Sequence, residues 1–200
     1  MLVRRHAVSG DHGAPAPSGP AGEAHLLSLV VGGDQRAFEE LYRIYYPRLT
    51  RFLGNMLRRR QLVEEVLDDC MLAIWKRPEG FNGTCKVSTW IFAIAYRKAL
   101  KALRKLDEPM EDKLAETRES GEAGPEQQLG FRQVQATLAG AIAELSADHR
   151  AVVDLTYFHE MGYREIAEIM ACPVDTVKTR MFHARRHLKA KLAGRLEDWL

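Results

Sequence analysis

The chain of 200 residues has only three cysteines and no long apolar run. Cys70, Cys85 and Cys172 lie far apart and form no Cys-x-x-Cys pair, which argues against a disulfide framework and against a zinc knot. No stretch approaches the ~18 consecutive apolar residues of a membrane-spanning helix, so we expect no membrane insertion. Residues 1–24 lack the continuous apolar segment of a signal peptide. These absences favour a protein of the reducing cytoplasm.

The strict alternation of apolar and polar residues that marks half-buried β-strands is missing as well. Apolar residues recur instead at three- and four-residue steps, which predicts an all-α protein. Asp34 and Ser146 are the predicted N-caps of two of its helices.

Two segments lack the helical periodicity. Residues 1–24 are rich in Gly, Pro and Ala, and residues 106–130 are acidic and interrupted by Gly and Pro. We therefore predict a disordered tail, a first helical domain over 25–105, a flexible acidic linker and a second helical domain over 131–200. With such a linker, we expect the free chain not to hold the two domains at a fixed distance.

Within the second domain, the segment 163–191 predicts two helices separated by a tight turn. The apolar residues of the first helix are Ile166, Ala167, Ile169 and Met170. Residues 171–173 (ACP) interrupt it, because proline cannot continue a helix interior but is favoured in the first turn of the next helix. The inward face of the second helix is marked by Val177, Met181, Ala184 and Leu188. This arrangement is typical of a helix-turn-helix.

The other face of that second helix is strongly basic. It carries Lys178, Arg180, Arg185, Arg186, Lys189 and Lys191, with His183 and His187 between them. A basic helix behind a short turn fits the major groove of DNA, where Lys and Arg neutralise phosphates and reach guanine edges. A solvated charge run is the alternative explanation. The two histidines have a metal-compatible spacing, but no third ligand lies near them in the sequence, so we expect no metal site.

An acidic face is predicted on an earlier helix, LVEEVLDDCMLAIWK. Its apolar residues lie on one side, and the other side carries Glu64, Glu65, Asp68 and Asp69 in like-charged pairs one turn apart. Such a pair costs roughly a few tenths of a kcal/mol in an isolated helix, which indicates a cationic partner for this face. A merely solvated acidic face is the alternative.

A second basic helix follows the turn-rich loop FNGTCKV, with Ser88 or Thr89 as its predicted N-cap. Its basic residues include Arg97, Lys98, Lys101 and Arg104, and no acidic residue interrupts them. The first domain thus presents one acidic and one basic surface, which suits two macromolecular partners of opposite charge.

Four segments in this order resemble the sigma factors of the extracytoplasmic-function type, members of the sigma-70 family that have only regions 2 and 4. The segments are AFEELYRIYYPRL, LVEEVLDDCMLAIWK, FNGTCKVSTWIFAIAYRKALKALRK and AELSADHRAVVDLTYFHEMGYREIAEIMACPVDTVKTRMFHARRHLKAKL. The resemblance implies that the first domain is region 2 and the second is region 4. It also implies that the protein directs core RNA polymerase to promoter DNA.

The resemblance further implies three groups of binding residues. Core polymerase would dock on the acidic face of Glu64, Glu65, Asp68 and Asp69. The unpaired −10 element would be bound by Asn82, Arg97, Lys98, Lys101 and Arg104. The −35 element would lie against Thr176, Lys178, Thr179, Arg180, Phe182, His183, Arg185 and Arg186. An anti-sigma factor is a further implied partner, and no cofactor is implied.

Four residues depart from the usual family pattern. Asp68 replaces a Gln, Arg97 an Asn, Asp175 a Gly and His183 an Arg. The first change keeps the docking charge, whereas the other three bear on which promoter bases are preferred.

Two other classes of protein share a helix-turn-helix. A one-component transcriptional regulator would combine it with a ligand-sensing domain and usually a dimer interface, whereas the first domain here carries two oppositely charged helices. A serine recombinase would need an α/β catalytic domain, and no strand pattern exists to build one. No catalytic or nucleotide-binding constellation accompanies these helices, so we expect no enzymatic activity.

Overall fold

The computed structural model describes residues 19–107 and 137–196, and all regular structure in these two ranges is helical. The elements are α1 (Pro20–Val31), α2 (Gln35–Leu57), α3 (Arg60–Lys76), the 3-10 turn η1 (Pro78–Gly80), α4 (Val87–Asp107), α6 (Ala147–Tyr157), α7 (Tyr163–Met170) and α8 (Val174–Leu196). Residues 137–143, before α6, are also helical. The all-α prediction is confirmed. Most of the predicted tail and linker lies outside the described residues.

Two predicted helix starts are confirmed by their caps. Asp34 Oδ1 accepts a hydrogen bond from the Ala37 backbone N–H at 3.0 Å, and Ser146 Oγ accepts one from the His149 N–H at 3.4 Å. Each side chain satisfies an amide that has no partner within its own helix. Among the described helices, none is long and apolar enough to cross a membrane.

The predicted end of the tail is wrong, because α1 begins at Pro20 rather than after residue 24. Proline is favoured in the first turn of a helix, where its missing N–H leaves no partner unsatisfied. The Tyr45 hydroxyl also donates a hydrogen bond of 2.7 Å to Glu23, which ties this first turn to α2.

The predicted N-cap of α4 is wrong as well. The helix begins at Val87, ahead of Ser88 and Thr89, and the Lys86 carbonyl already accepts the Trp90 N–H at 3.1 Å. Thr89 therefore lies within the first turn, where its side chain is buried.

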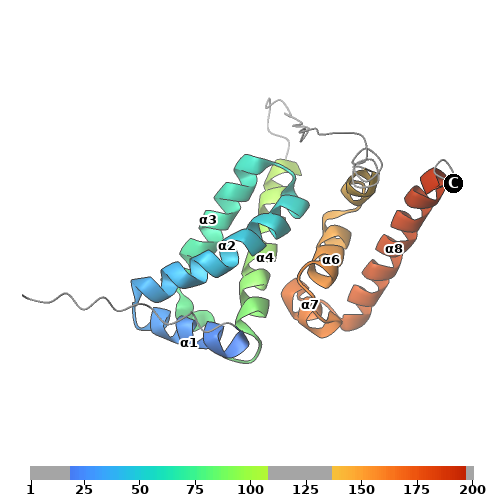
Figure 1. Ribbon diagram of the computed structural model, residues 1–200. Coiled ribbons are helices and arrows are strands. Elements are labelled where there is room, and N and C mark those ends of the chain that lie inside the picture. The colour runs from blue at the N-terminus through green and yellow to red at the C-terminus, as the bar shows by residue number, and fades with distance from the viewer. Residues whose placement is uncertain (1–18, 108–136, 197–200) are drawn as a thin grey trace, which may run out of the picture.

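The described helices form two units that lie side by side (Figure 1). The N-terminal unit consists of α1 to α4, and the C-terminal unit consists of the 137–143 helix with α6, α7 and α8. α6 packs on α2, and α7 packs on α4. Buried apolar side chains of both units belong to one continuous cluster.

This packing contradicts the expectation that the two units are not held at a fixed distance. His159, which follows α6, packs against Phe92 and Phe52 of the N-terminal unit, with ring centroids 4.5 and 6.2 Å away. Asn55 Nδ2 donates to Asp154 Oδ1 beside these rings. Sequence periodicity identifies the apolar face of a helix but not the unit that covers it. Phe158, at the end of α6, is 47 % exposed, with the Arg51 guanidinium 3.6 Å from its ring centroid.

Candidate nucleic-acid interface

The helix-turn-helix consists of α7, a tight turn and α8. Ala171 ends α7 in the left-handed conformation, with φ of 50°, and the Cys172 N–H donates to the Ala167 carbonyl at 3.0 Å. Pro173 stands just before α8, and its carbonyl accepts the Thr176 N–H at 3.0 Å. The inward face of α8 is buried as predicted, at Val177, Met181 and Ala184. The turn therefore fixes α8 on α7 and α6.

The opposite side of α8 faces away from the N-terminal unit (Figure 1). We call its exposed residues the recognition face: Lys178, Thr179, Phe182, His183, Arg185 and Arg186. Phe182 is 62 % exposed although it is apolar. Lys178 pairs with Asp175 at 2.9 Å, and Arg185 Nε donates to the Tyr157 hydroxyl at 3.0 Å. These weak surface contacts leave the cations available to phosphates and base edges.

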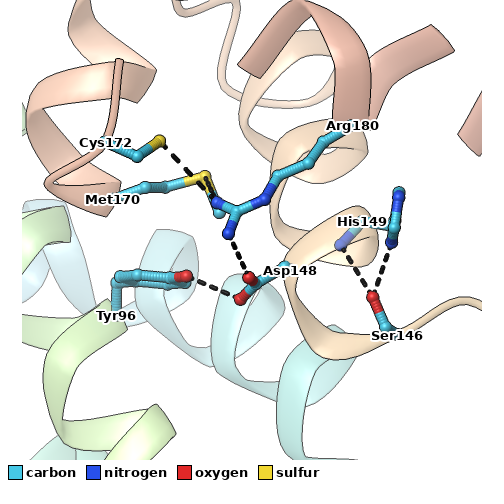
Figure 2. A network of polar contacts seen from close by, with 7 residues as sticks. All are labelled: Tyr96, Ser146, Asp148, His149, Met170, Cys172 and Arg180. Atoms are coloured by element: carbon cyan, nitrogen blue, oxygen red, sulfur yellow. Dashed lines mark hydrogen bonds and ion pairs between the residues drawn. The ribbon is translucent and has the colours of Figure 1, made fainter. Parts of the chain in front are cut away.

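Arg180 differs from its neighbours on α8, and Thr176 is only partly exposed. The Arg180 guanidinium points back toward α6, where Nη2 lies 2.5 Å from Asp148 Oδ2 (Figure 2). Nη1 faces Met170 Sδ at 3.9 Å and Cys172 Sγ at 3.7 Å. The side chain is 24 % exposed. The structure thus does not bring Arg180 together with the recognition face, to which the sequence had assigned it.

Asp148 links α8 to the N-terminal unit as well. Its Oδ1 accepts a hydrogen bond of 2.7 Å from the hydroxyl of Tyr96 on α4. The Asp148 carboxylate therefore lies between Tyr96 and Arg180 (Figure 2). Burial, together with this bond to a carboxylate, raises the pKa of Tyr96. The phenol therefore stays a neutral donor. This network could not be predicted from local patterns, because its members come from three separate helices.

The basic residues of α4 differ in how far they are exposed. Arg97, Lys101 and Arg104 are exposed, while Lys98 is partly covered and lies 3.4 Å from Asp69 of α3. Asn82, in the loop before α4, accepts hydrogen bonds from the Thr84 N–H and hydroxyl at 3.1 and 2.7 Å. These bonds shape the loop. Asn82 therefore has a structural role in addition to its predicted role in DNA binding.

The acidic face of α3 is exposed at all four predicted positions, Glu64, Glu65, Asp68 and Asp69. Beside it lies an open groove of about 660 Å³ between α2 and α3, lined by Tyr42, Tyr46, Thr50, Gly54, Arg58, Arg59, Arg60, Val63, Glu64, Leu67 and Asp68. The Tyr42 and Tyr46 rings are stacked 5.4 Å apart. A tyrosine pair one helical turn apart is the sequence signal that could have indicated this surface cluster.

Two family models of the sigma-70 family match the chain. The model described as Sigma-70 region 2 matches residues 41–108, and the one described as Sigma-70, region 4 matches residues 135–188. The chain belongs to the sigma-70 family. The two matches fall on the two units described above, so the N-terminal unit is region 2 and the C-terminal unit is region 4.

Individual relatives agree with this membership. An ECF RNA polymerase sigma-E factor of Haemophilus influenzae is 28 % identical over 177 residues, which cover 84 % of this chain and 93 % of the relative. Two solved structures share the fold. CnrH in complex with the cytosolic domain of CnrY has a TM-score of 0.63 at 23 % identity, covering 86 % of this chain and 97 % of that one. The sigma factor RpoE of Bartonella quintana, in complex with the anti-sigma factor NepR, has a TM-score of 0.60 at 21 % identity, covering 78 % and 96 %.

Proposed function

We propose that this protein is a sigma factor of the extracytoplasmic-function type, which binds core RNA polymerase and directs it to promoters through −10 and −35 elements. One observation supports this most strongly. Within a fold shared with sigma factors, α8 turns a basic recognition face outward, while α3 and α4 present an acidic and a basic surface on the other unit. The acidic surface suits core polymerase, and the two basic surfaces suit the two DNA elements.

Region 4 is proposed to bind the −35 element in its major groove. Lys178, Arg185 and Arg186 supply cations for phosphates and guanine edges, and Phe182 supplies apolar contact area. Thr179 and His183 complete the set of base-edge contacts, with Thr176 at the margin. Arg180 supports this surface from behind, since its guanidinium is bound to Asp148.

Region 2 is proposed to bind the −10 element along α4 and the loop before it. Arg97, Lys101 and Arg104 form an exposed basic row that fits the backbone of a separated DNA strand. Lys98 joins them once its contact with Asp69 is released, and Asn82 holds the loop in shape.

Core polymerase is proposed to bind the acidic face of α3, at Glu64, Glu65, Asp68 and Asp69, because this face is exposed and its charge is complementary to a basic partner surface. A cytoplasmic location follows from the same partner. An anti-sigma factor is a proposed regulator, since one structural relative is described in complex with one. Neither catalysis nor a cofactor is part of the proposal.

Co-purification with core polymerase and promoter-dependent transcription test this function together. Purified protein is added to core polymerase and to fragmented genomic DNA of the organism that encodes it, and transcript 5′ ends are sequenced. We expect transcripts from a small set of sites that core polymerase alone does not use. A chain that neither binds core polymerase nor changes its start sites would contradict the proposal.

A further inference from the structure

The last residue of α6, Tyr157, is an exposed aromatic side chain beside the recognition face. It is 54 % exposed, so burial of apolar surface does not account for its place. Its hydroxyl accepts a hydrogen bond of 3.0 Å from Arg185 Nε, and the guanidinium carbon lies 5.8 Å from the centroid of its ring. Tyr157 belongs to α6 and therefore lies outside the two helices of the helix-turn-helix, yet it is joined to the face that would meet DNA.

Arg185 differs from other cations of α8 in the kind of group that positions it. Lys178 pairs with the Asp175 carboxylate at 2.9 Å. Arg180 pairs with the Asp148 carboxylate. A carboxylate competes with a DNA phosphate for its cation, whereas the phenol that holds Arg185 is neutral. The contact thus sets the direction of the guanidinium without reducing its positive charge.

The bond also leaves donors on both partners. Arg185 uses Nε toward the hydroxyl, so the N–H groups of Nη1 and Nη2 can reach another acceptor. The Tyr157 hydroxyl accepts this bond with a lone pair and still has its own proton to donate. Because the hydroxyl and the guanidinium are in contact, these donors can bind two oxygens of one phosphate group. Arginine and tyrosine are both among the side chains that contact phosphates in protein–DNA complexes.

The position of Arg185 along α8 favours the DNA backbone over the bases. The base-edge contacts of a recognition helix come mainly from its N-terminal residues, whereas Arg185 lies in the middle of α8. Exposed side chains on its side of the helix recur at helical spacing: Lys178, Phe182, Arg185 and Lys189. Tyr157 extends this row of contacts onto α6.

We propose that Tyr157 and Arg185 form a phosphate clamp, in which the hydroxyl and the guanidinium donate to the oxygens of one DNA phosphate at the edge of the −35 element. The proposal rests on the DNA-binding function proposed above and adds a binding residue from outside the helix-turn-helix. Tyr157 has a second effect, because it orients the guanidinium before DNA arrives. A side chain ordered in advance loses less conformational entropy on binding.

Removing one oxygen atom gives the first test. Tyr157→Phe keeps the ring and removes the hydroxyl of an exposed residue, so the melting temperature should change little. We expect the full chain with this substitution to bind a DNA duplex of mixed sequence roughly two- to ten-fold more weakly, as measured by fluorescence anisotropy. Wild-type affinity of this variant would overturn the proposal.

Tyr46→Phe is the matched control. It removes the same atom from a tyrosine that is 43 % exposed on α2 of the other unit. We expect it to bind the duplex like the wild type. An equal loss of affinity in both variants would show that the loss does not come from a clamp on α6 and α8.

The dependence of binding on salt counts the phosphate contacts. Arg185→Ala should lower the slope of log affinity against log salt concentration by about one, since the cation of one phosphate contact is removed. An unchanged slope would show that Arg185 meets no phosphate and would contradict the clamp.

A double-mutant cycle tests whether the two side chains act as a unit. With Arg185→Ala in place, Tyr157→Phe should cost less affinity than it does in the wild type, because the hydroxyl no longer has a cation to orient. The control cycle combines Tyr157→Phe with Lys178→Ala, a cation that pairs with Asp175 instead. In that cycle we expect the two losses to add. If the loss from Tyr157→Phe is the same with and without Arg185, the two residues act independently and the clamp is refuted.

Transcription with core polymerase separates a phosphate contact from a base contact. Run-off transcription compares promoters whose upstream elements differ by single base pairs. Tyr157→Phe and Arg185→Ala should lower transcription from all of them by a similar factor, since every sequence carries the same phosphates. A changed order of promoter strengths in either variant would assign the pair to bases and contradict the proposal.

The duplex measurements need no polymerase, so the clamp and the proposed function can fail separately. A chain that directs promoter-specific transcription, but whose Tyr157→Phe variant binds duplex DNA like the wild type, would keep its function and lose the clamp. A chain in which the pair shows the coupled loss on duplex DNA, but which directs no transcription, would keep the clamp and lose the proposed sigma function.

Discussion

Lys178 and Arg180 lie two residues apart on α8, yet their environments differ. The Lys178 side chain is 59 % exposed and pairs with the surface residue Asp175. Arg180 reaches inward to Asp148, because this carboxylate lies on α6 under the same stretch of α8. A run of basic residues therefore contains both DNA-binding and supporting side chains, and only packing separates the two roles.

Substituting Arg180 should act on stability before it acts on promoter choice. Arg180→Ala leaves Asp148 without its cation, and the loss of such a charged hydrogen bond costs about 1.5–3 kcal/mol. We expect a lower melting temperature in calorimetry, together with reduced transcription from every promoter alike. Unchanged stability with an altered order of promoter strengths would show that Arg180 reads bases.

Substituting Arg186 should change promoter choice and leave stability unchanged. Arg186 is exposed on the recognition face, and a bidentate arginine–base contact contributes roughly 1–3 kcal/mol of discrimination. Arg186→Ala should keep the melting temperature of the wild type while flattening the differences between promoters in run-off transcription. Wild-type promoter ranking would contradict a base contact at this position.

His149 makes region 4 sensitive to acid. Burial lowers its pKa from the ordinary value of 6.5, and the nearby positive charges of His183 and Arg180 lower it further. Below pH 6.5 the unfolded chain then binds more protons than the folded one, so the free energy of unfolding falls as the pH drops. In denaturant titrations, His149→Gln should lose stability less steeply below pH 6.5 than the wild type. Equal slopes would exclude His149 as the cause.

At the scale of helices, the sequence predicted what depends on neighbouring residues. The caps Asp34 and Ser146, the break at Pro173 and the inward face of α8 follow from local hydrogen bonding and periodicity, and the structure confirms them. The Tyr96–Asp148–Arg180 network could not be predicted, because its residues come from α4, α6 and α8. The same holds for His159, whose aromatic partners belong to the other unit.

The acidic face of α3 can be tested as one element. Glu65→Lys with Asp69→Lys reverses two charges on an exposed face and should abolish binding to core polymerase. Both residues are exposed, and the variant gives up the surface contact of Asp69 with Lys98, so the melting temperature should change little. Co-purification with tagged core polymerase measures the binding.

A matched control for this variant lies on the same unit. Glu79→Lys, in η1 just after the end of α3, alters an exposed acid that is not one of the four residues of the acidic face, and should bind polymerase like the wild type. Undiminished binding of the α3 variant, or equal loss in the control, would remove α3 as the docking site.

For the whole molecule, the packing of the two units changes what the free chain can do. The sequence predicts two DNA-binding modules that are not held at a fixed distance, whereas α6 and α7 join them through a shared core. Their recognition face and basic row remain exposed, but their spacing is set by this interface rather than by DNA. Linked modules gain avidity only where the geometry lets both engage at once. We therefore expect promoter recognition to depend on a partner that holds the units apart.

Mapping transcript starts with core polymerase tests the central claim most directly. The proposed sigma factor predicts start sites that share two upstream sequence elements at a fixed spacing. Arg186→Ala, on α8, should alter preference only at the element farther from the start, and Arg97→Ala, on α4, only at the nearer one. Tight binding of the free protein to a single site, without any change in polymerase start sites, would contradict the account and favour a one-component regulator.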